Sequence, residues 1–237
     1  MQVHHFHSWE VTPSEAIEIQ QQLRARIIPQ GEVKSPGLIA GADVAFDKQA
    51  EMAYASVVVL EFPSLAILET AVGKERVSFP YIPGLLSFRE TPALLRAFEN
   101  LTHDPDLIFI DGQGVSHPRG AGIACHIGVL LDRPAIGCAK SVLLGIYKEP
   151  EPSRGSVSHL YDREGRVIGA AVRSRDRVRP VFVSIGHRID LQQAIQLTLA
   201  CTRGYRIPEP TRQADLLAGR ALSCSDDSRM VSGLRPR

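Results

Sequence analysis

The sequence lacks the features of a membrane or secreted protein. No stretch approaches the roughly 18 consecutive apolar residues of a membrane span. The polar N-terminus MQVHHFHSWEVTPSEA has neither the apolar core nor the small-residue cleavage site of a signal peptide. Its four cysteines are scattered, without a Cys-x-x-Cys pair for zinc. We therefore expect a cytoplasmic protein with reduced thiols and no membrane partner.

The sequence also lacks an excess of charge of one sign, because 27 Lys and Arg residues balance 26 Asp and Glu residues. This balance argues against a protein that holds nucleic acid mainly by its net charge, but leaves room for an enzyme with a local basic face. The chain is 44% hydrophobic and 22% charged, which is ordinary for a globular protein. Without repeats or Ser/Gly linkers, we expect one domain over residues 1–222, followed by a disordered tail over 223–237, where apolar periodicity ends.

The order of apolar segments predicts an α/β fold. Three apolar segments separated by turns, at 38–46, 53–62 and 65–72, are typical of an antiparallel meander. Alternating helices and strands follow, so we expect a mixed sheet with helices on its faces. The predicted helices are 13–28 with Thr12 as its cap, 91–101, 120–131, 191–201 and 211–222; the later strands are 107–110, 134–140, 156–161, 166–173 and 181–185.

Two aspartates lie in apolar strand segments: Asp43 in LIAGADVAF, and Asp111 directly after LIFI. A carboxylate in such a place is costly unless it is paired, hydrogen-bonded or bound to metal. A single strand-end aspartate is more often a turn starter, but two from neighbouring strands favour a site. Paired carboxylates are hard oxygen ligands suited to Mg²⁺ or Mn²⁺.

Two loops could carry binding functions. In VSFPYIPGLLSFRET, prolines flank Tyr81-Ile82, which indicates either a stiff loop packed on the core or an aromatic wedge that enters stacked bases. DGQGVSHPRGAG is rich in glycine, so its amide groups could meet phosphate or a base edge, although it matches neither a P-loop nor a dinucleotide fingerprint. His117 in this loop is either a proton donor or phosphate contact, or a solvated loop residue.

Two further charged residues lie at the ends of predicted elements, and each has an ordinary structural interpretation as well as a functional one. Lys140 follows the strand PAIGCA, either as a surface lysine or as a cation beside the acids. Asp215 lies at the start of a predicted helix, where it either complements the helix dipole or joins the acids.

Taken in order, five segments resemble the endonuclease V family of deoxyinosine-directed repair nucleases: GADVAF, PYIPGLLSFRE, LIFIDGQGVSHPRGAGIACHIGV, IGCAKS and GYRIPEPTRQAD. The similarity runs from about Leu23 to Leu217. It implies a ribonuclease H-like fold with three antiparallel strands followed by parallel ones. It also implies a Mg²⁺-dependent enzyme, in which Mn²⁺ can substitute, that cuts the second phosphodiester bond 3′ to a deaminated base and leaves a 3′-hydroxyl and a 5′-phosphate.

The resemblance also assigns residues. It implies a catalytic set of Asp43, Glu90, Asp111, His117 and Lys140; metal ligands Asp43, Glu90, Asp111 and, least securely, Asp215; Tyr81 as the wedge; and a lesion pocket of Gly84, Leu86, Gly112, Gly122 and Ile123. Some family members have His at the position of Asp215. The grip on the duplex would come from Arg89, Arg119, Arg173, Arg175, Arg177 and Arg179, although such a basic run is usually a solvated face.

The expected partner is deoxyinosine-containing DNA, duplex or single-stranded, bound by a monomer. Two other functions compete. An inosine-directed ribonuclease on the same fold is one, since inosine in RNA is a substrate for some relatives. A catalytically silent binding module is the other, and the presence of Asp43, Glu90 and Asp111 argues against it.

Overall fold

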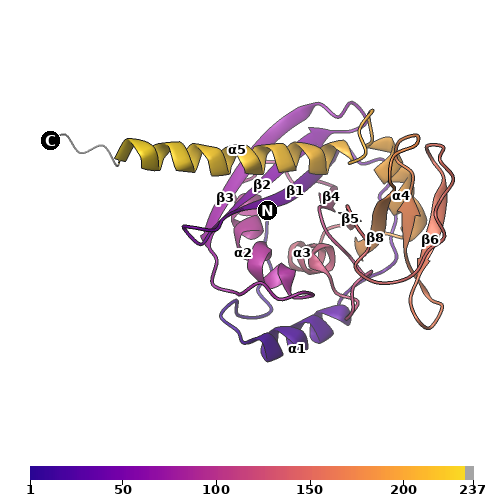
Figure 1. The fold of residues 1–237 in the computed structure, drawn as a ribbon, viewed down its shortest axis with the longest axis horizontal. Coiled ribbons are helices and arrows are strands. Elements are labelled where there is room, and N and C mark those ends of the chain that lie inside the picture. The colour runs from indigo at the N-terminus through magenta and orange to yellow at the C-terminus, as the bar shows by residue number, and fades with distance from the viewer. Residues whose placement is uncertain (233–237) are drawn as a thin grey trace.

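An eight-stranded mixed sheet forms the centre of the molecule, in the order β3-β2-β1-β4-β5-β8-β7-β6 (Figure 1). This computed structural model describes the backbone of residues 1–232 and the side chains of residues 1–224. The strands are β1 Leu38–Asp47, β2 Met52–Glu61, β3 Ile67–Arg76, β4 Leu107–Ile110, β5 Ala135–Ala139, β6 Val157–Tyr161, β7 Val167–Val172 and β8 Val181–His187.

The sheet has a parallel centre between two antiparallel parts. Strands β1, β2 and β3 form the predicted antiparallel meander, and β4 and β5 continue the sheet parallel to β1. The hairpin β6–β7 and strand β8 then add a second antiparallel part, in which β8 pairs with β5. The predicted fold class, a mixed sheet of three antiparallel strands followed by parallel ones and flanked by helices, is confirmed.

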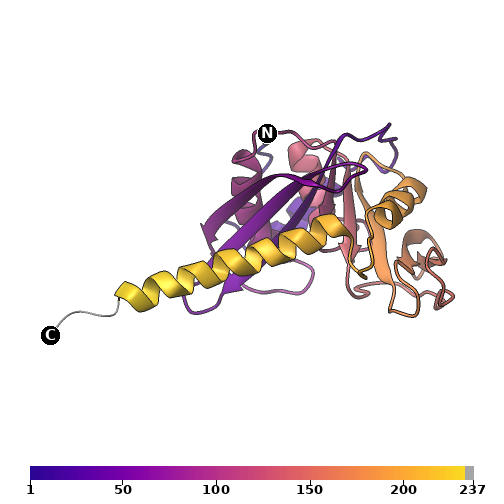
Figure 2. The same ribbon diagram turned by 90° about the horizontal axis from the view of Figure 1, so that it is seen from above.

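Helices cover both faces of the sheet (Figures 1 and 2). The alternation along β1 shows the division: Ala40 and Ala42 pack with α2 and α3, while Ile39 packs with the face covered by α4 and α5. The helices are α1 Pro13–Arg24, α2 Leu86–Glu99, α3 Ile123–Leu131, α4 Leu191–Ala200 and α5 Glu209–Ser232. Among the described residues, none of the helices is long and apolar enough to cross a membrane.

Several helix ends differ from those predicted. Helix α1 has the predicted Thr12 cap, reinforced by Glu15 in a capping box, but ends at Arg24 instead of residue 28. Helix α2 begins at Leu86, five residues before the predicted start, and α3 begins at Ile123 instead of residue 120. The glycines before Ile123 form a turn, with Gly120 at φ 65°.

The largest difference concerns the predicted tail. Helix α5 continues to Ser232, ten residues past the predicted end at Leu222. The segment 223–232 contains neither glycine nor proline, so nothing in its composition ends the helix, even though it lacks apolar periodicity. The helix thus includes 223–232 of the predicted tail, and residues 233–237 lie outside the described part of the chain.

Candidate metal centre and adjoining cavity

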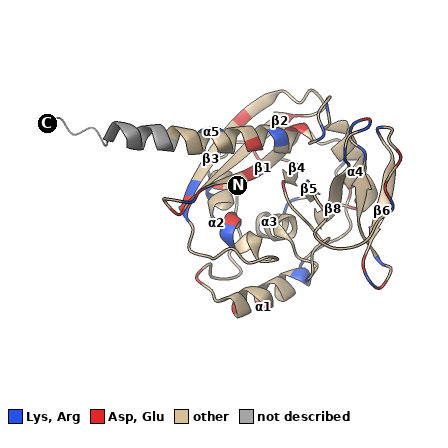
Figure 3. Cartoon of the chain, in the orientation of Figure 1, with Lys and Arg blue, Asp and Glu red and all other residues tan. Residues whose placement is uncertain are grey.

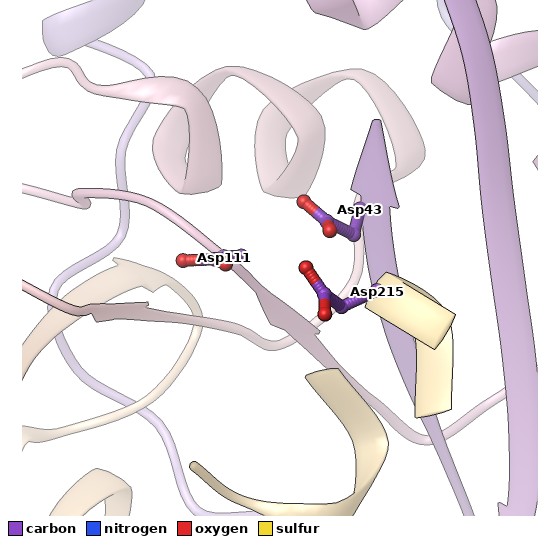
Figure 4. A group of neighbouring side chains, drawn as sticks. All are labelled: Asp43, Asp111 and Asp215. Carbon is purple, nitrogen blue, oxygen red and sulfur yellow. The ribbon is translucent and has the colours of Figure 1, made fainter. Parts of the chain in front are cut away.

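Three aspartates converge where β1, β4 and α5 meet (Figure 4). Asp43 lies in β1, Asp111 directly follows β4, and Asp215 is in the second turn of α5. The parallel pairing of Ala42 with Ile110 places the first two side by side. One carboxylate oxygen from each of the three lies within 4.8 Å of the others, so the group could hold a metal ion.

Glu90 lies close to these aspartates but is not part of the three-residue group. It is in the second turn of α2. Burial raises the pKa of Glu90 to about 8, and the charges of Asp43 and Asp111 contribute. Burial likewise raises the pKa of Asp43 to about 7, with Asp111 as the next cause. Burial and the negative charges of neighbouring carboxylates therefore both oppose ionisation of these groups.

Lys140, which directly follows β5, provides a cation for the group. Its Nζ lies 2.6 Å from Asp111 Oδ2 and 3.5 Å from Asp215 Oδ1. Burial lowers the pKa of Lys140, but the hydrogen bond and charge of Asp111 outweigh that effect, so the pKa is raised overall. Lys140 is therefore an ion-paired residue of this cluster and not an isolated surface lysine.

The donor set fits a hard divalent cation. All three grouped ligands are carboxylates, the ligand type that Mg²⁺ and Mn²⁺ prefer. A cation between them would remove the repulsion that raises the pKa of Asp43. Asp215, the least secure of the metal residues expected from the sequence, lies in the group, whereas Glu90 lies beside it.

A cavity of about 130 Å³ lies between the Pro-rich loop, which carries Tyr81, and the glycine-rich loop after Asp111; its lining residues Ser87 and Gln113 are close in sequence to Glu90 and Asp111. Its small size suits a single base and not a larger ligand, for which pockets usually measure ~300–1,000 Å³. Five residues predicted to bind the substrate line it: Tyr81, Gly84, Leu86, Gly122 and Ile123. The sixth, Gly112, lies behind this wall, because a Cβ on it would be 2.6 Å from the Ile123 Cγ2 atom.

The wedge candidate Tyr81 is 70% exposed while it lines this cavity, which places its ring at the rim. Gln20, Gln113 and Leu143 also line the cavity, although no motif in the sequence marks them as site residues. Gln20 comes from α1 and Leu143 from the loop after β5. Only tertiary packing brings them to the site, so no local pattern marks them.

His117 is neither a solvated loop residue nor a member of the acidic group. It is 5% exposed, its Nε2 lies 3.0 Å from the Gly84 carbonyl oxygen, and its Nδ1 accepts a hydrogen bond from the Arg119 backbone N–H. Burial lowers the pKa of His117 to about 4, and the Arg119 charge adds to the effect. The ring is therefore neutral near pH 7 and connects the two loops.

Five of the six arginines expected to grip the duplex divide into two sets. Arg173 is buried and donates to Glu149 and to the carbonyls of Pro150, Glu151 and Val178. Arg89 donates to the Phe79 carbonyl, so both have structural partners. Arg175, Arg177 and Arg179 are exposed. Both basic and acidic residues occur along the loops at the β6 end of the sheet (Figure 3).

Carboxylates that converge from two strands of a mixed sheet and a helix packed on it, together with a base-sized cavity that has an aromatic rim, fit a metal-dependent nuclease. The comparisons with known proteins agree. The family model for endonuclease V matches residues 21–216. The chain belongs to the endonuclease V family and is a nuclease of that class.

Two relatives and three solved structures illustrate the similarity. Endonuclease V of Methanothrix thermoacetophila is 50% identical over 90% of this chain and 93% of its own length; that of Trichormus variabilis is 48% identical over 92% and 99%. The crystal structure of endonuclease V from Streptomyces avermitilis has a TM-score of 0.88 and 43% identity, and covers 95% of this chain and 100% of its own. The structure from Bacillus subtilis has a TM-score of 0.90 and 30% identity, and covers 96% of this chain and 100% of its own.

A third structure contains nucleic acid. Endonuclease V of Ciona intestinalis, in complex with a 24mer DNA containing an inosine followed by a ribo-adenosine, has a TM-score of 0.78 and 28% identity, and covers 89% of this chain and 97% of its own.

Proposed function

We propose that this protein is a DNA repair endonuclease that recognises deaminated bases, chiefly deoxyinosine. It hydrolyses the second phosphodiester bond on the 3′ side of the lesion and leaves a 3′-hydroxyl and a 5′-phosphate. The observation that carries the proposal is the combination of three convergent carboxylates with a base-sized cavity, which has Tyr81 at its rim and Gln113, two residues after Asp111, in its wall. The Ciona relative in complex with inosine-containing DNA supports the choice of substrate.

The residues that would hold Mg²⁺ are Asp43, Asp111 and Asp215, with Glu90 close behind them. Bound there, Mg²⁺ would offset the charge of the phosphate and activate water for attack on phosphorus, and Mn²⁺ has the same preference for carboxylates. Lys140 holds Asp111 and Asp215 in place by its ion pairs and adds positive charge where the phosphate would lie.

Selection of the lesion would take place in the cavity. Hypoxanthine pairs weakly, so its extrusion from the duplex costs less than that of a normal base. Tyr81 would fill the gap left in the stack, while the backbone of Gly84, Gly122 and Ile123 would meet the edge of the extruded base. A backbone surface can approach a base closely, since the two glycines have no side chain to hold it off.

Two further properties belong to the proposal. Cys125, Cys138 and Cys201 are buried free thiols and Cys224 is an exposed one, which supports a cytoplasmic enzyme. Inosine-containing RNA is the second candidate substrate, favoured by the ribonucleotide that follows inosine in the Ciona complex.

The test is to map cleavage sites on matched inosine-containing DNA duplexes, single strands and RNA, with and without Mg²⁺. We expect one cut at the second bond 3′ to deoxyinosine, only with Mg²⁺, and none on the same strand with guanine instead. Asp111→Asn is the inactive control. Faster cleavage of the RNA would favour the second candidate, and cuts at any other position would contradict the proposed reaction.

A further inference from the structure

The backbone carbonyl of Gly84, at the end of the loop that carries Tyr81, accepts hydrogen bonds from three side chains. The Nε2 atoms of Gln20 and His117 each lie 3.0 Å from it, and the Arg119 Nη2 atom lies 2.5 Å from it. A carbonyl oxygen has two lone pairs, so three donors saturate it. This one atom therefore ties the wedge loop to α1 and to the glycine-rich loop.

The donors also support one another. Gln20 is 1% exposed and uses its whole amide: its Nε2 donates to the carbonyls of Gly84 and Ala121, and its Oε1 accepts from Arg119 Nε. A buried amide with all its hydrogen bonds made has a fixed orientation, because rotation would leave polar atoms unpaired. Gln20 and Arg119 thus form one unit and not two separate contacts.

The backbone of Gly84 is adapted to this contact. Its φ of 80° lies in the left-handed region, which glycine adopts without strain. A Cβ on Gly84 would lie only 2.8 Å from the Arg119 Nη2 atom, inside the space that the guanidinium occupies. The loop therefore passes against Arg119 with no side chain between them.

We propose that Gln20 and Arg119 are positioning residues that hold the wedge loop in its base-accepting position through the carbonyl of Gly84. The inference rests on the proposed function of the cavity, whose wall this loop forms. A loop that is already ordered loses little freedom when the base enters, so the free energy of ordering does not reduce affinity. Within the described part of the chain, the hydrogen bonds of the pair involve none of the three aspartates, so the pair acts on binding of the lesion and not on the chemical step.

The test compares Gln20→Met and Arg119→Met, which keep most of the side-chain volume, with Gln21→Ala, an exposed neighbour on α1. On inosine duplex DNA with Mg²⁺, we expect KM to rise about tenfold in each Met variant, as loss of ~1.4 kcal/mol of hydrogen bonding would give. The value of kcat should stay within about twofold of wild type. The double variant should lose much less than the product of the single losses, because the two residues act as a unit.

Hydrogen–deuterium exchange of residues 79–85 without DNA provides a readout that does not depend on activity. We expect faster exchange than wild type in both Met variants and wild-type exchange in Gln21→Ala. The exchange rate of Arg119→Lys should lie between that of wild type and that of Arg119→Met. Unchanged exchange, unchanged KM or a loss confined to kcat would overturn the inference. If wild-type enzyme cuts no inosine substrate, the proposed function fails, whereas normal wild-type cleavage with unchanged variants rejects only the positioning role.

Discussion

At the scale of single residues, the chemistry of Asp43 is governed by burial and by its acidic neighbours. Its pKa is raised to about 7, mainly by burial and next by the charge of Asp111. Lys140 lowers the pKa of Asp43 but is already engaged with Asp111 and Asp215. The group thus carries negative charge that Lys140 offsets only in part, the condition under which carboxylates bind a divalent ion.

Replacing either strand aspartate by its amide should separate cleavage from binding. We expect Asp43→Asn and Asp111→Asn to abolish Mg²⁺-dependent cleavage while they leave the fold and the affinity for inosine DNA largely intact. The amide removes a charged metal ligand but keeps the shape of the side chain, and it relieves repulsion between carboxylates. Single-turnover cleavage and DNA binding measured on the same samples give the two readouts.

The matched control for these variants is Glu18→Gln, on the exposed face of α1. It removes one negative charge without touching the acidic group, so its cleavage rate should equal that of wild type. Substantial Mg²⁺-dependent cleavage by both aspartate variants would remove the proposed mechanism.

Individual residues also show which parts of the site could be predicted from the sequence. Asp43 and Asp111 could be selected because a carboxylate in an apolar strand needs a partner, a rule that depends only on local sequence. His117 could not be placed, because its neutrality follows from burial and from contact with Gly84, a residue distant in sequence. Gln20 carried no local signal at all, since polar residues on amphipathic helices usually face water.

At the scale of elements, the start of α2 decides the position of Glu90. The sequence predicted a helix from residue 91, yet the structure begins it at Leu86 and contains Pro92 in its interior. Proline removes one helical hydrogen bond and normally marks a helix start. Burial of Phe88, 2% exposed and packed with Phe79, favours the extra turn that carries Glu90 toward Asp43. Tertiary packing has overridden a local rule.

The contact between β1 and α5 should control the position of Asp215. A Cβ on Gly41 would lie 2.0 Å from the backbone of Pro210, so Gly41→Ala must push α5 away from the sheet. We expect the free energy of unfolding to fall by about 1–3 kcal/mol, as for other overpacked cores. Mg²⁺ affinity should fall too, because Asp215 moves with the helix. Chemical denaturation and metal titration measure the two effects.

Gly219→Ala on the same helix is the control, since Gly219 is exposed and an added Cβ there meets nothing within 4 Å. It should raise stability by up to about 1 kcal/mol through helix propensity. If Gly41→Ala were as stable as wild type and bound Mg²⁺ equally well, close packing of α5 on β1 would not position Asp215.

The loop that carries Tyr81 should distinguish paired from unpaired substrates. An inserted ring replaces stacking worth about 1–3 kcal/mol per base. Tyr81→Ala should therefore weaken binding and cleavage of inosine in duplex DNA more than in single strands, where less stacking has to be replaced. The cut position and the metal dependence should not change, since the acids are untouched. An equal loss on both substrates would mean that Tyr81 only packs against the cavity.

At the scale of the whole molecule, the acidic group connects parts of the chain that are far apart in sequence. The succession of strands and helices along the chain could be predicted from apolar segments and the turns between them. The convergence of Asp215 with the strand aspartates could not, because it requires α5 to lie across β1 and the Ser56 hydroxyl to donate to the Ala214 carbonyl. Resemblance to the family supplied what periodicity could not.

Because this group connects β1, β4 and α5, a bound cation should stabilise the entire fold. The folded-state pKa values of Asp43 and Glu90, about 7 and about 8, lie above those of unfolded carboxyls near 4. Without metal, the folded protein therefore binds more protons, and stability falls as pH rises from about 4 to 8. Mg²⁺ competes with those protons, so its stabilising effect should grow over the same range.

We accordingly expect saturating Mg²⁺ to raise Tm by several degrees at about pH 8 and by much less at about pH 5.5. At 100 times Kd the gain is about 2.7 kcal/mol, or roughly 5–10 °C for a protein of this size. Thermal unfolding with Mg²⁺, compared with NaCl of equal ionic strength, measures the difference. Asp111→Asn should lose most of the rise at both pH values, whereas Glu18→Gln should retain it. A rise independent of pH, or one that persists in Asp111→Asn, would place the bound cation elsewhere on the protein.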